Sequence, residues 1–504
     1  MERTLLDSGV GHDFRRPAQS PVLDLVTVLC EELKSAGVSY CHWKSNEALD
    51  RSASGDNDLD LLVRRADLAR FTELLLRLGF KEARLPHKRE RPGVLHHYGR
   101  DPASGRLVHV DSQSQLLLGD DTTKNYRLPM EDAYLASAQQ GTLFALPAPE
   151  YELAVFVIRM VVKHGTWDAI GYGRGRLNAT EQRELAWLEE RADPAKIAEL
   201  VCQHLPYIGE ALWQSCRQCL HPDATVIQRV DTARRLRGAL AGNARFPSSV
   251  DTALRLWRRA SWGTQRYLLG RRTKKRLASG GALIALVGGD GAGKSSAVEG
   301  VSSLLSQAFL TTRVHLGKPS RSMTTLVVKG PVYVASRFGL FPSVRITPWA
   351  TTEEDWVPTY AWLIWHALNA RDRYLEYARA RRFAGRGGLV VCDRFPLPQL
   401  VYMDGTRTQS LLDARHLPRL ARKLVELERR SYARINYPDV LIVLRVDPAI
   451  AVARRHDEEE DFVRRRNQEV WERDWLGTPA VVVDAGAPKA DVLREILSVV
   501  WSRL

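Results

Sequence analysis

Short apolar stretches separated by amphipathic ones dominate the first part of the chain. Residues 22–38 and 68–78 show the three- and four-residue spacing of amphipathic helices. Four shorter stretches have the composition of strands, and the last two are joined by a turn that contains proline and glycine. This alternation predicts a compact α/β unit over about residues 22–147. The four strand-like stretches lie at 39–43, 58–63, 94–98 and 106–111.

The hydrophobic pattern changes twice after that unit. From residue 149 to about residue 276 the apolar spacing is helical, and we find no convincing strand. Gly280 and Gly281 then interrupt the chain, and an apolar strand follows at once. We therefore predict a mixed α/β fold in four segments. These are an N-terminal α/β domain at 20–148, a helical extension at 149–250, a basic linker at 251–280, and a C-terminal domain at 281–504 whose parallel sheet is flanked by helices.

The net charge of +14 and the isoelectric point near 9.6 indicate a surface that attracts anions. Much of the excess lies in the linker, where basic residues alternate with tryptophan and tyrosine. A solvated linker helix is one interpretation, and a peripheral contact with a membrane or a nucleic acid is the other. The basic residues concerned are Arg255, Arg258, Arg259, Arg266, Arg271, Arg272, Lys274, Lys275 and Arg276.

Three features lead us to expect a cytoplasmic protein. No run of about eighteen uncharged apolar residues could span a bilayer. The first twenty residues are polar, and the next apolar stretch is interrupted by charges, unlike the core of a signal peptide. The six cysteines are scattered and too few to staple a chain of this length. The sequence leaves the oligomeric state open, with a dimer among the options.

A glycine-rich segment after the strand at 283–287 has the spacing GxxxxGK[ST]. Glycines let successive backbone amides turn toward phosphate oxygens, and the start of the following helix adds its partial positive charge. Lys294 is expected to reach the β- and γ-phosphates, and the Ser295 hydroxyl to bind Mg²⁺. The segment therefore predicts a site for ATP and Mg²⁺. Its residues are Gly288, Asp290, Gly291, Ala292, Gly293, Lys294, Ser295 and Ser296.

Further motifs in this half of the chain resemble the thymidylate kinase family. The loop sequence Gly-Asp-Gly-Ala-Gly-Lys-Ser-Ser is followed, in the family's order, by a strand that ends in Asp393-Arg394-Phe395. Between them, Arg373 lies on a long predicted helix, close to where the family places an arginine for the acceptor nucleotide. The resemblance implies a P-loop kinase that uses ATP and Mg²⁺. It also includes a strand at 441–446, a lid-like segment at 454–466 and a last strand at 481–484.

The expected chemistry rests on a few side chains near the P-loop. Asp393, at the carboxyl end of a parallel strand, is expected to orient magnesium-bound water or the acceptor. Arg394 is expected to bind a phosphate, and Arg454 is expected to close over the γ-phosphate with the lid residues Arg464 and Arg465. An exposed, salt-bridged helix stays open as the alternative for the lid, because glutamates lie between these arginines.

The acceptor is expected to differ from thymidine monophosphate. Where the family has a loop of the Arg-Glu-Pro-Gly type, this chain has Gly-Lys-Pro-Ser-Arg, and an insert-like segment follows at 322–356. We therefore expect a nucleotide or another phosphorylated small molecule. The residues expected to bind it are Lys318, Arg321 and Arg373.

The N-terminal α/β domain resembles the nucleotidyltransferase superfamily. Asp58 and Asp60 lie two residues apart on a predicted strand, so both point to the same face. Asp111, on a later strand, supplies a third carboxylate, and the resemblance implies a triad that binds metal ions for nucleotidyl transfer. Lys44 and Ser45 stand where the superfamily has a Gly-Ser turn, whose glycine is missing here, and are expected to bind the substrate. A degenerate domain that only binds nucleotide or a partner stays open.

These motifs together predict a two-domain transferase. Its C-terminal half is expected to move the γ-phosphoryl group of ATP to a nucleotide or another phosphate-bearing acceptor, while its N-terminal half binds or transfers a nucleotide. Two alternatives stay open. One is a nucleotide-regulated switch that docks on a membrane or a nucleic acid through the basic linker, and the other is a nucleotidyltransferase that modifies RNA or protein.

Overall fold

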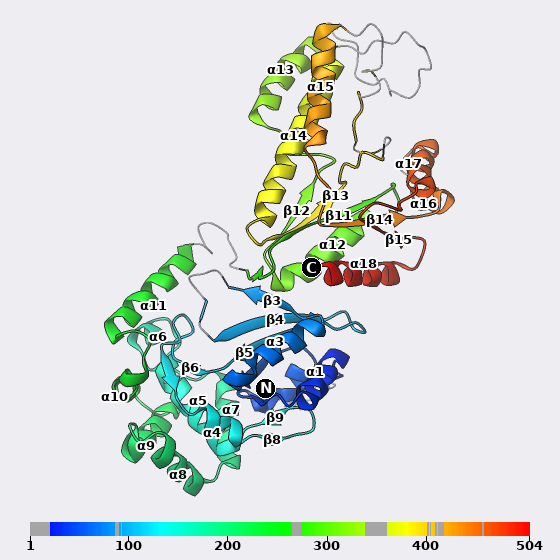
Figure 1. Ribbon diagram of the computed structural model, residues 1–504. Helices are drawn as coiled ribbons and strands as arrows, with labels where there is room; N and C mark the ends of the chain where they lie inside the picture. Colours follow the sequence, from blue (N-terminus) through cyan, green and yellow to red (C-terminus); the bar gives the residue numbers. More distant parts are fainter. Residues whose placement is uncertain are drawn as a thin grey trace, which may run out of the picture. The chain divides into compact units, whose positions relative to one another are not determined.

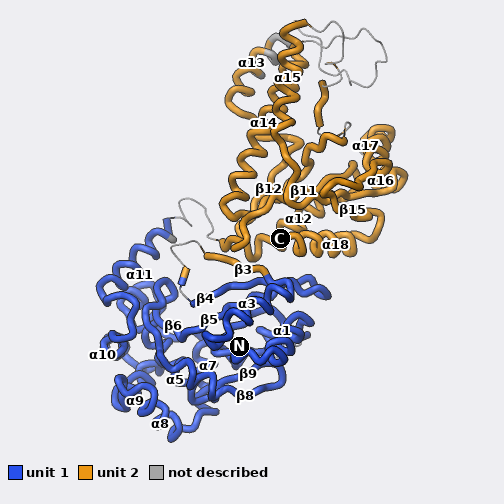
Figure 2. Tube along the Cα trace, in the orientation of Figure 1, with its two compact units in different colours: residues 1–80, 91–264 blue, residues 81–90, 265–504 orange. Residues whose placement is uncertain are grey.

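A computed structural model describes residues 21–85, 90–91, 93–264, 274–337, 360–400, 403, 405–408, 411, 418–455 and 458–504. The chain divides into two compact units, coloured separately in Figure 2. Unit 1 contains the residues up to Phe80 and those from Arg91 to Thr264, and unit 2 contains Lys81–Glu90 and Gln265–Leu504. Among the described residues, no helix is both long and apolar enough to cross a membrane.

A small sheet organises the first part of unit 1 (Figure 1). Strands β2 and β5 run parallel, while β1 is antiparallel to β2 and β4 is antiparallel to β5. Helices α1 and α3 cover it with fully buried side chains such as Leu29, Leu33 and Leu75. The elements are α1 (Asp24–Ser35), β1 (Tyr40–His42), α2 (Leu49–Ala53), β2 (Leu59–Val63), α3 (Leu68–Arg77), β4 (Val94–Arg100) and β5 (Leu107–Gln113), with short 3₁₀ turns at Asn46–Ala48 and Arg65–Asp67.

Helices build a second core in unit 1 around α5. This helix is buried on nearly every side, which explains the uninterrupted apolar run at 153–158 in its middle. Asn178 and Thr225 begin α7 and α10 with capping boxes. The elements are β6 (Leu116–Leu118), β7 (Tyr126–Leu128), α4 (Glu131–Ala136), β8 (Gln139–Gln140), β9 (Ala145–Leu146), α5 (Pro149–His164), α6 (Trp167–Gly171), α7 (Ala179–Arg191), α8 (Pro194–His204), α9 (Gly209–Leu220), α10 (Val226–Ala239), a 3₁₀ turn (Ala241–Asn243) and α11 (Ser248–Gly263).

Unit 2 is built on a parallel sheet of order β12-β13-β11-β14-β15. Its central strands are buried on both faces, as a parallel sheet covered by helices requires. Leu283, Ala285 and Val287 share a core with Tyr377 of α14, while α12 packs with α18. The elements are β11 (Ala282–Gly288), α12 (Lys294–Ala308), β12 (Thr311–His315), α13 (Met323–Arg337), α14 (Tyr360–Ala384), β13 (Leu389–Asp393), α15 (Arg419–Ala433), β14 (Val440–Arg445), α16 (Pro448–Arg454), α17 (Glu460–Glu472), β15 (Ala480–Asp484) and α18 (Lys489–Arg503), and β3 (Lys81–Arg84) pairs with β10 (Arg276–Leu277).

The mixed α/β fold expected from the sequence is confirmed. Every strand predicted in the N-terminal domain has a counterpart in β1, β2, β4 or β5, and the parallel sheet of unit 2 carries the glycine-rich loop. The first part of the predicted linker is helix α11 in unit 1, and residues 276–277 form the short strand β10, which the helical pattern did not predict. Much of the insert-like segment lies outside the described residues, with Arg345, Trp349 and Trp356.

Candidate nucleotide-binding site

The glycine-rich loop turns sharply between a strand and a helix of unit 2. Strand β11 ends at Gly288, and helix α12 begins at Lys294. Gly291 and Gly293 have φ values of 86° and 82°, a left-handed backbone that glycine adopts without strain. A Cβ atom at Gly291 would also lie 2.8 Å from the carbonyl oxygen of Ala451. The loop therefore needs glycine at these positions, and it ends at the N-terminus of a helix, where phosphate is favoured.

Asp290 in this loop holds three basic side chains. The ammonium of Lys294 lies 3.6 Å and the guanidinium of Arg394 lies 3.1 Å from its Oδ1 atom, while Arg466 lies 2.6 Å from Oδ2. Lys294 also donates a hydrogen bond of 2.6 Å to the carbonyl oxygen of Gly289. Burial favours the neutral form of Asp290, but the three cations outweigh it and lower the pKa of this carboxyl group. Asp290 thus holds three positive charges at the loop, where a polyphosphate would need them.

Helix α17 is fastened to the loop through Asn467. Its side-chain amide donates to the carbonyl oxygens of Asp290, at 2.9 Å, and Val463, at 2.8 Å. The side chain is fully buried. A Cβ atom at Gly289 would lie only 2.0 Å from its Oδ1 atom, so the amide fills the space above this glycine. The sequence placed Arg466 at the end of the lid-like segment without assigning it a contact and gave no signal for Asn467, and α17 brings both to the loop from far along the chain.

Asp393 stands at the end of β13, beside the loop. Its Oδ1 atom is buried and accepts no hydrogen bond from the described residues, and Oδ2 lies 3.9 Å from Nε2 of His315. The next residue, Arg394, has a φ of 56°, which few residues other than glycine adopt, and reaches Asp290 from there. A buried carboxylate oxygen without a partner calls for a group from outside the chain. Together with the exposed Ser295 at the start of α12, it fits Mg²⁺ bound to a nucleotide.

A cavity of about 290 Å³ lies beside the loop. The loop residues from Gly291 to Gly293 and Ser296 form one side, and α18 forms the other with Lys489 and the apolar side chains of Val492, Leu493 and Ile496. Arg454, at the end of α16, borders the cavity and donates to the carbonyl oxygens of Ala485, at 2.9 Å, and Gly486, at 3.4 Å. A mostly apolar cavity with an arginine at its border suits the flat base of a nucleotide.

The residues predicted to bind the acceptor divide into two kinds. Arg373 is buried on α14 and donates to the carbonyl oxygens of Leu316, at 2.6 Å, and Gly317, at 3.2 Å. It also contacts the hydroxyl of Tyr432. Its visible role is therefore to hold the start of the loop that carries the other two predicted residues. Those residues, Lys318 and Arg321, are exposed.

The predicted lid arginines also differ from one another. Arg464 and Arg465 are exposed on α17, whereas Arg466 on the same helix reaches Asp290 and Arg454 borders the cavity. The helix spans 460–472, and residues 456–457 lie outside the described part of the chain. Charge alone gave no signal that distinguishes these arginines, because their orientation depends on helix phase.

No family model matches the chain. Two curated proteins are similar to part of it, each named "Uncharacterized ATP-binding protein YghR", from Escherichia coli K12 and Escherichia coli O6:H1. Each is 27% identical over 220 residues, which cover 42% of this chain and 84% of the relative. This distant similarity supports nucleotide binding and identifies no reaction.

Unit 1 brings together the three carboxylates predicted from its sequence. Asp60 on β2 lies directly opposite Asp111 on β5, and Asp58 precedes β2. Burial raises the pKa of Asp111; Lys44 opposes this shift, and Asp60 contributes to it. The Lys44 ammonium lies 2.8 Å from Oδ1 of Asp60. The two inner strands thus carry an acidic cluster, formed by Asp58, Asp60 and Asp111, with Lys44 among its carboxylates.

Two histidines contact this acidic cluster, and a turn with a left-handed residue lies near it. His109 lies 2.7 Å from Asp58, and His96 lies 3.6 Å from Asp111. Ser45 has a φ of 60°, and its amide donates to Glu184 at 3.1 Å. No group of three or more His, Cys, Asp or Glu side chains is arranged to hold a metal ion in the part of the chain that the structure describes.

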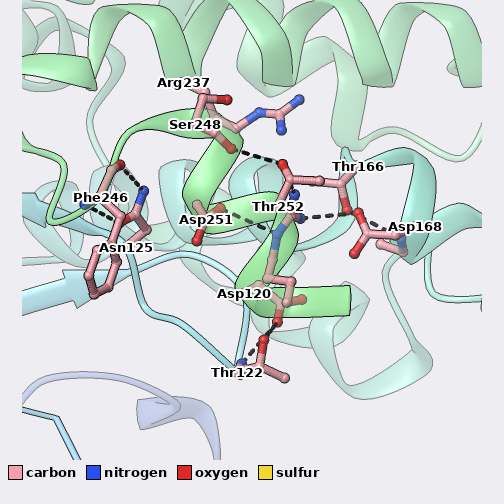
Figure 3. Close-up of polar contacts among 12 residues, drawn as sticks. Asp120, Thr122, Asn125, Thr166, Asp168, Arg237, Phe246, Ser248, Asp251 and Thr252 are labelled. Carbon is pink, nitrogen blue, oxygen red and sulfur yellow. Dashed lines mark hydrogen bonds and ion pairs between the residues drawn. The ribbon is translucent and has the colours of Figure 1, made fainter. Parts of the chain in front are cut away.

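The basic helix α11 is tied to unit 1 by ion pairs (Figure 3). Arg255 is buried and lies 3.1 Å from Asp168 and 3.3 Å from Asp251. Arg259 lies 2.6 Å from the other oxygen of Asp168 and also pairs with Asp120. These arginines neutralise carboxylates of their own unit. Of the other basic linker residues, Arg266, Arg271 and Arg272 lie outside the described residues with their neighbours at 265–273, whereas Lys274, Lys275 and Arg276 are described.

Proposed function

We propose that unit 2 is an ATP-dependent phosphotransferase of the nucleoside monophosphate kinase type. One observation carries the proposal: Lys294, Arg394 and Arg466 meet at the glycine-rich loop, beside a buried oxygen of Asp393 that has no partner among the described residues. Simple nucleotide binding needs the loop and its lysine. Two further cations and an unpartnered carboxylate at the same place suit the transfer of a phosphoryl group, whose charge must be stabilised.

The proposed reaction is an in-line transfer. An oxygen of the acceptor forms a bond to the γ-phosphorus of ATP while the bond to the β–γ bridging oxygen breaks, so that ADP leaves with the electron pair. Lys294, Arg394 and Arg466 exchange Asp290 for phosphoryl oxygens. Mg²⁺, held with the nucleotide by Ser295 and Asp393, would neutralise phosphate charge. Asp393 also orients the acceptor oxygen, and Arg454 holds the base.

The proposed acceptor carries a phosphate of its own. The exposed Lys318 and Arg321 follow β12, at the same edge of the sheet as Asp393, and Arg373 fixes the start of their loop. Two flexible cations on a fixed loop suit a phosphorylated small molecule or a nucleotide. For unit 1, we propose nucleotide binding or nucleotidyl transfer at Asp58, Asp60 and Asp111.

Transfer from γ-labelled ATP to a panel of nucleoside monophosphates and sugar phosphates tests the kinase proposal. We expect labelled product with one acceptor class, at least about a hundred-fold less in Lys294→Ala, and unchanged transfer in Lys423→Ala, an exposed lysine on α15. Acceptor-independent hydrolysis that is stimulated by lipid vesicles or DNA would instead favour the nucleotide-regulated switch. Label from α-labelled nucleotide on RNA or protein, lost in Asp60→Asn, would favour a macromolecule-modifying nucleotidyltransferase.

A further inference from the structure

Three arginines of unit 1 point at one short loop between β6 and β7. Arg91 donates to the carbonyl oxygen of residue 121, Arg258 to that of residue 122 at 2.5 Å, and Arg245 to that of residue 123 at 3.4 Å. These acceptors are neutral carbonyl oxygens, and the carboxylates that act electrostatically on Arg91 are Asp121 and Asp111. The Nε atoms of Arg91 and Arg258 are buried and find no acceptor among the described residues. The arginines therefore keep donors for another anion.

Two lysines share the same place with one exposed carboxylate. Lys124 lies 3.1 Å from Oδ1 of Asp121, and Lys163 lies 3.9 Å from Oδ2 and 2.9 Å from Glu181. The side chain of Asp121 is 57% exposed, and those of the two lysines are 20% and 27% exposed. With the three arginines and the pair of Arg259 with Asp120, six cations lie near three carboxylates among the described residues, so positive charge is in excess at a position that solvent reaches.

The backbone at Lys124 is strained in a way that serves this clustering. Its φ of 45° lies in the left-handed region, which costs a residue other than glycine about 1 kcal/mol. Burial lowers the pKa of its ammonium to about 8; Asp121 opposes the shift, and the nearby charges of Lys44 and Arg91 add to it. A turn without function could place this side chain in solvent at lower cost. Here it is held next to other cations.

Lys44 links these cations to the acidic cluster of Asp58, Asp60 and Asp111. Lys44 contacts Asp60 and acts electrostatically on both Asp111 and Lys124, and Arg91 acts on Asp111. The carboxylates of β2 and β5 and the cations around the β6–β7 loop thus act on one another electrostatically. This is the division that a nucleotide requires, with anionic groups for bound metal and cationic groups for phosphate oxygens.

We propose that Arg91, Lys124, Lys163, Arg245 and Arg258 form a polyphosphate-binding site, which holds the phosphate chain of a nucleoside triphosphate in unit 1. The proposal rests on the nucleotide binding proposed above for unit 1, and it adds residues that the sequence motifs did not contain. Asp121 occupies the site in the absence of ligand and competes with it. A nucleic acid would need a longer basic track than one loop, so we commit to a small polyphosphate.

Calorimetric titration of inorganic tripolyphosphate into the full-length Lys294→Ala variant, at about pH 6.5, tests the site with the P-loop weakened. We expect Lys124→Gln together with Arg91→Gln to lower the affinity at least about ten-fold, because a charge-assisted hydrogen bond contributes more than one factor of ten. The matched control is Lys196→Gln, an exposed lysine on α8 of the same unit, which should stay within about two-fold. When the same double variant is made in a chain that keeps Lys294, its kinase activity should be unchanged. Failure of the polyphosphate-site proposal can therefore be told apart from failure of the kinase proposal.

Asp121→Asn gives a second and opposite readout. Removing the built-in competitor should tighten tripolyphosphate binding several-fold, whereas a purely structural ion pair predicts no tightening. This variant also decides the question if the double variant fails to fold. The proposal would be overturned by an unchanged affinity in the double variant or by no tightening in Asp121→Asn. It would also be overturned if a single-stranded RNA oligonucleotide bound to the protein and was displaced only by millimolar tripolyphosphate.

Discussion

Individual residues in unit 2 show how closely the glycine-rich loop is fitted to helix α17. Gly289 has no room for a side chain because the buried amide of Asn467 lies above it. Asp290, the next residue, collects three cations and one hydrogen bond to its carbonyl oxygen. A single added methyl group or a lost carboxylate therefore acts on two elements at once.

Gly289→Ala tests this fit. The new Cβ atom must displace Asn467, so we expect unit 2 to lose about 1–3 kcal/mol of unfolding free energy and ATP affinity to fall at least ten-fold. Urea denaturation and equilibrium binding measure the two effects. Gly238→Ala, in α10, where a Cβ would meet nothing within 4 Å, should be neutral or slightly stabilising. Equal behaviour of the two variants would contradict the close packing.

Glu152 of α5 gives unit 1 a pH-dependent stability. Burial raises its pKa from 4.5 to about 8; hydrogen bonds from Asn46 oppose the shift, and Glu184 adds to it. The folded state then holds a proton that the unfolded state has lost, so stability is full below about pH 4.5 and declines as the pH rises toward 8. We expect Glu152→Gln to remove this decline.

The measurement is the unfolding free energy of unit 1 at about pH 5 and about pH 8. The natural chain should lose more than about 1 kcal/mol between them beyond what the Glu152→Gln variant loses. Glu210→Gln, an exposed residue on α9, serves as the control and should follow the natural chain. Parallel pH curves for all three proteins would refute the assignment.

The residue scale also marks the limit of prediction from sequence. The spacing of Gly288 to Ser295 was enough to expect the loop, because local backbone requirements dictate it. Arg466 and Asn467 carry no such local signal, and which of three consecutive arginines faces inward depends on the phase of α17 against the sheet. The same holds for Arg373, whose expected contact is a phosphate and which instead donates to two backbone carbonyls and contacts the Tyr432 hydroxyl.

Among the elements, α17 separates an inward arginine from two outward ones. Arg466 contacts Asp290, while Arg465 is exposed one residue earlier. We expect Arg466→Ala to lower kcat for phosphoryl transfer about 10²-fold or more, because it removes a cation from the reacting phosphates. Arg465→Ala is the matched control and should keep kcat within about two-fold. Comparable losses in both would indicate that the whole helix, rather than one side chain, closes on the nucleotide.

Helix α11 is the second element whose role the structure makes specific. The sequence left open a solvated linker helix or a peripheral contact with a membrane or a nucleic acid, and in the structure Arg255 and Arg259 pair with Asp168, Asp251 and Asp120. Arg259→Ala would leave the buried Asp120 without its cation, while Asp168 keeps Arg255, and we expect unit 1 to lose about 2–3 kcal/mol of unfolding free energy. Thermal or urea unfolding measures the loss, and Arg234→Ala, exposed on α10, should cost less than about 0.5 kcal/mol. An unchanged stability with weaker binding to anionic vesicles would support the membrane interpretation instead.

At the scale of the whole molecule, the fold class could be predicted because hydrophobic period and glycine breaks are local signals. Positions of β1, β2, β4 and β5 followed from period-two patterns, and β11 followed from its apolar run before the loop. Short pairings such as β3 with β10 could not be predicted, since two-residue strands have no period and join segments far apart in sequence. The basic cluster around residues 121–123 was missed for a related reason: its members come from five separate parts of the chain.

The two proposed nucleotide sites predict a stoichiometry. Titration of the natural chain with a non-hydrolysable ATP analogue and Mg²⁺ should yield about two binding events, one of which disappears in Lys294→Ala and the other in Lys124→Gln with Arg91→Gln. A single event that is abolished by Lys294→Ala alone would leave unit 1 without a nucleotide site under these conditions.

In the proposed ATP site, the carboxylate of Asp290 competes with small anions for the three cations that a triphosphate would contact. Lys294, Arg394 and Arg466 already contact the carboxylate of Asp290. Orthophosphate or sulfate must displace this carboxylate, and each has too few oxygens to contact all three cations. A chain of three linked phosphates offers enough. Millimolar inorganic ions would therefore compete poorly with a triphosphate for this loop.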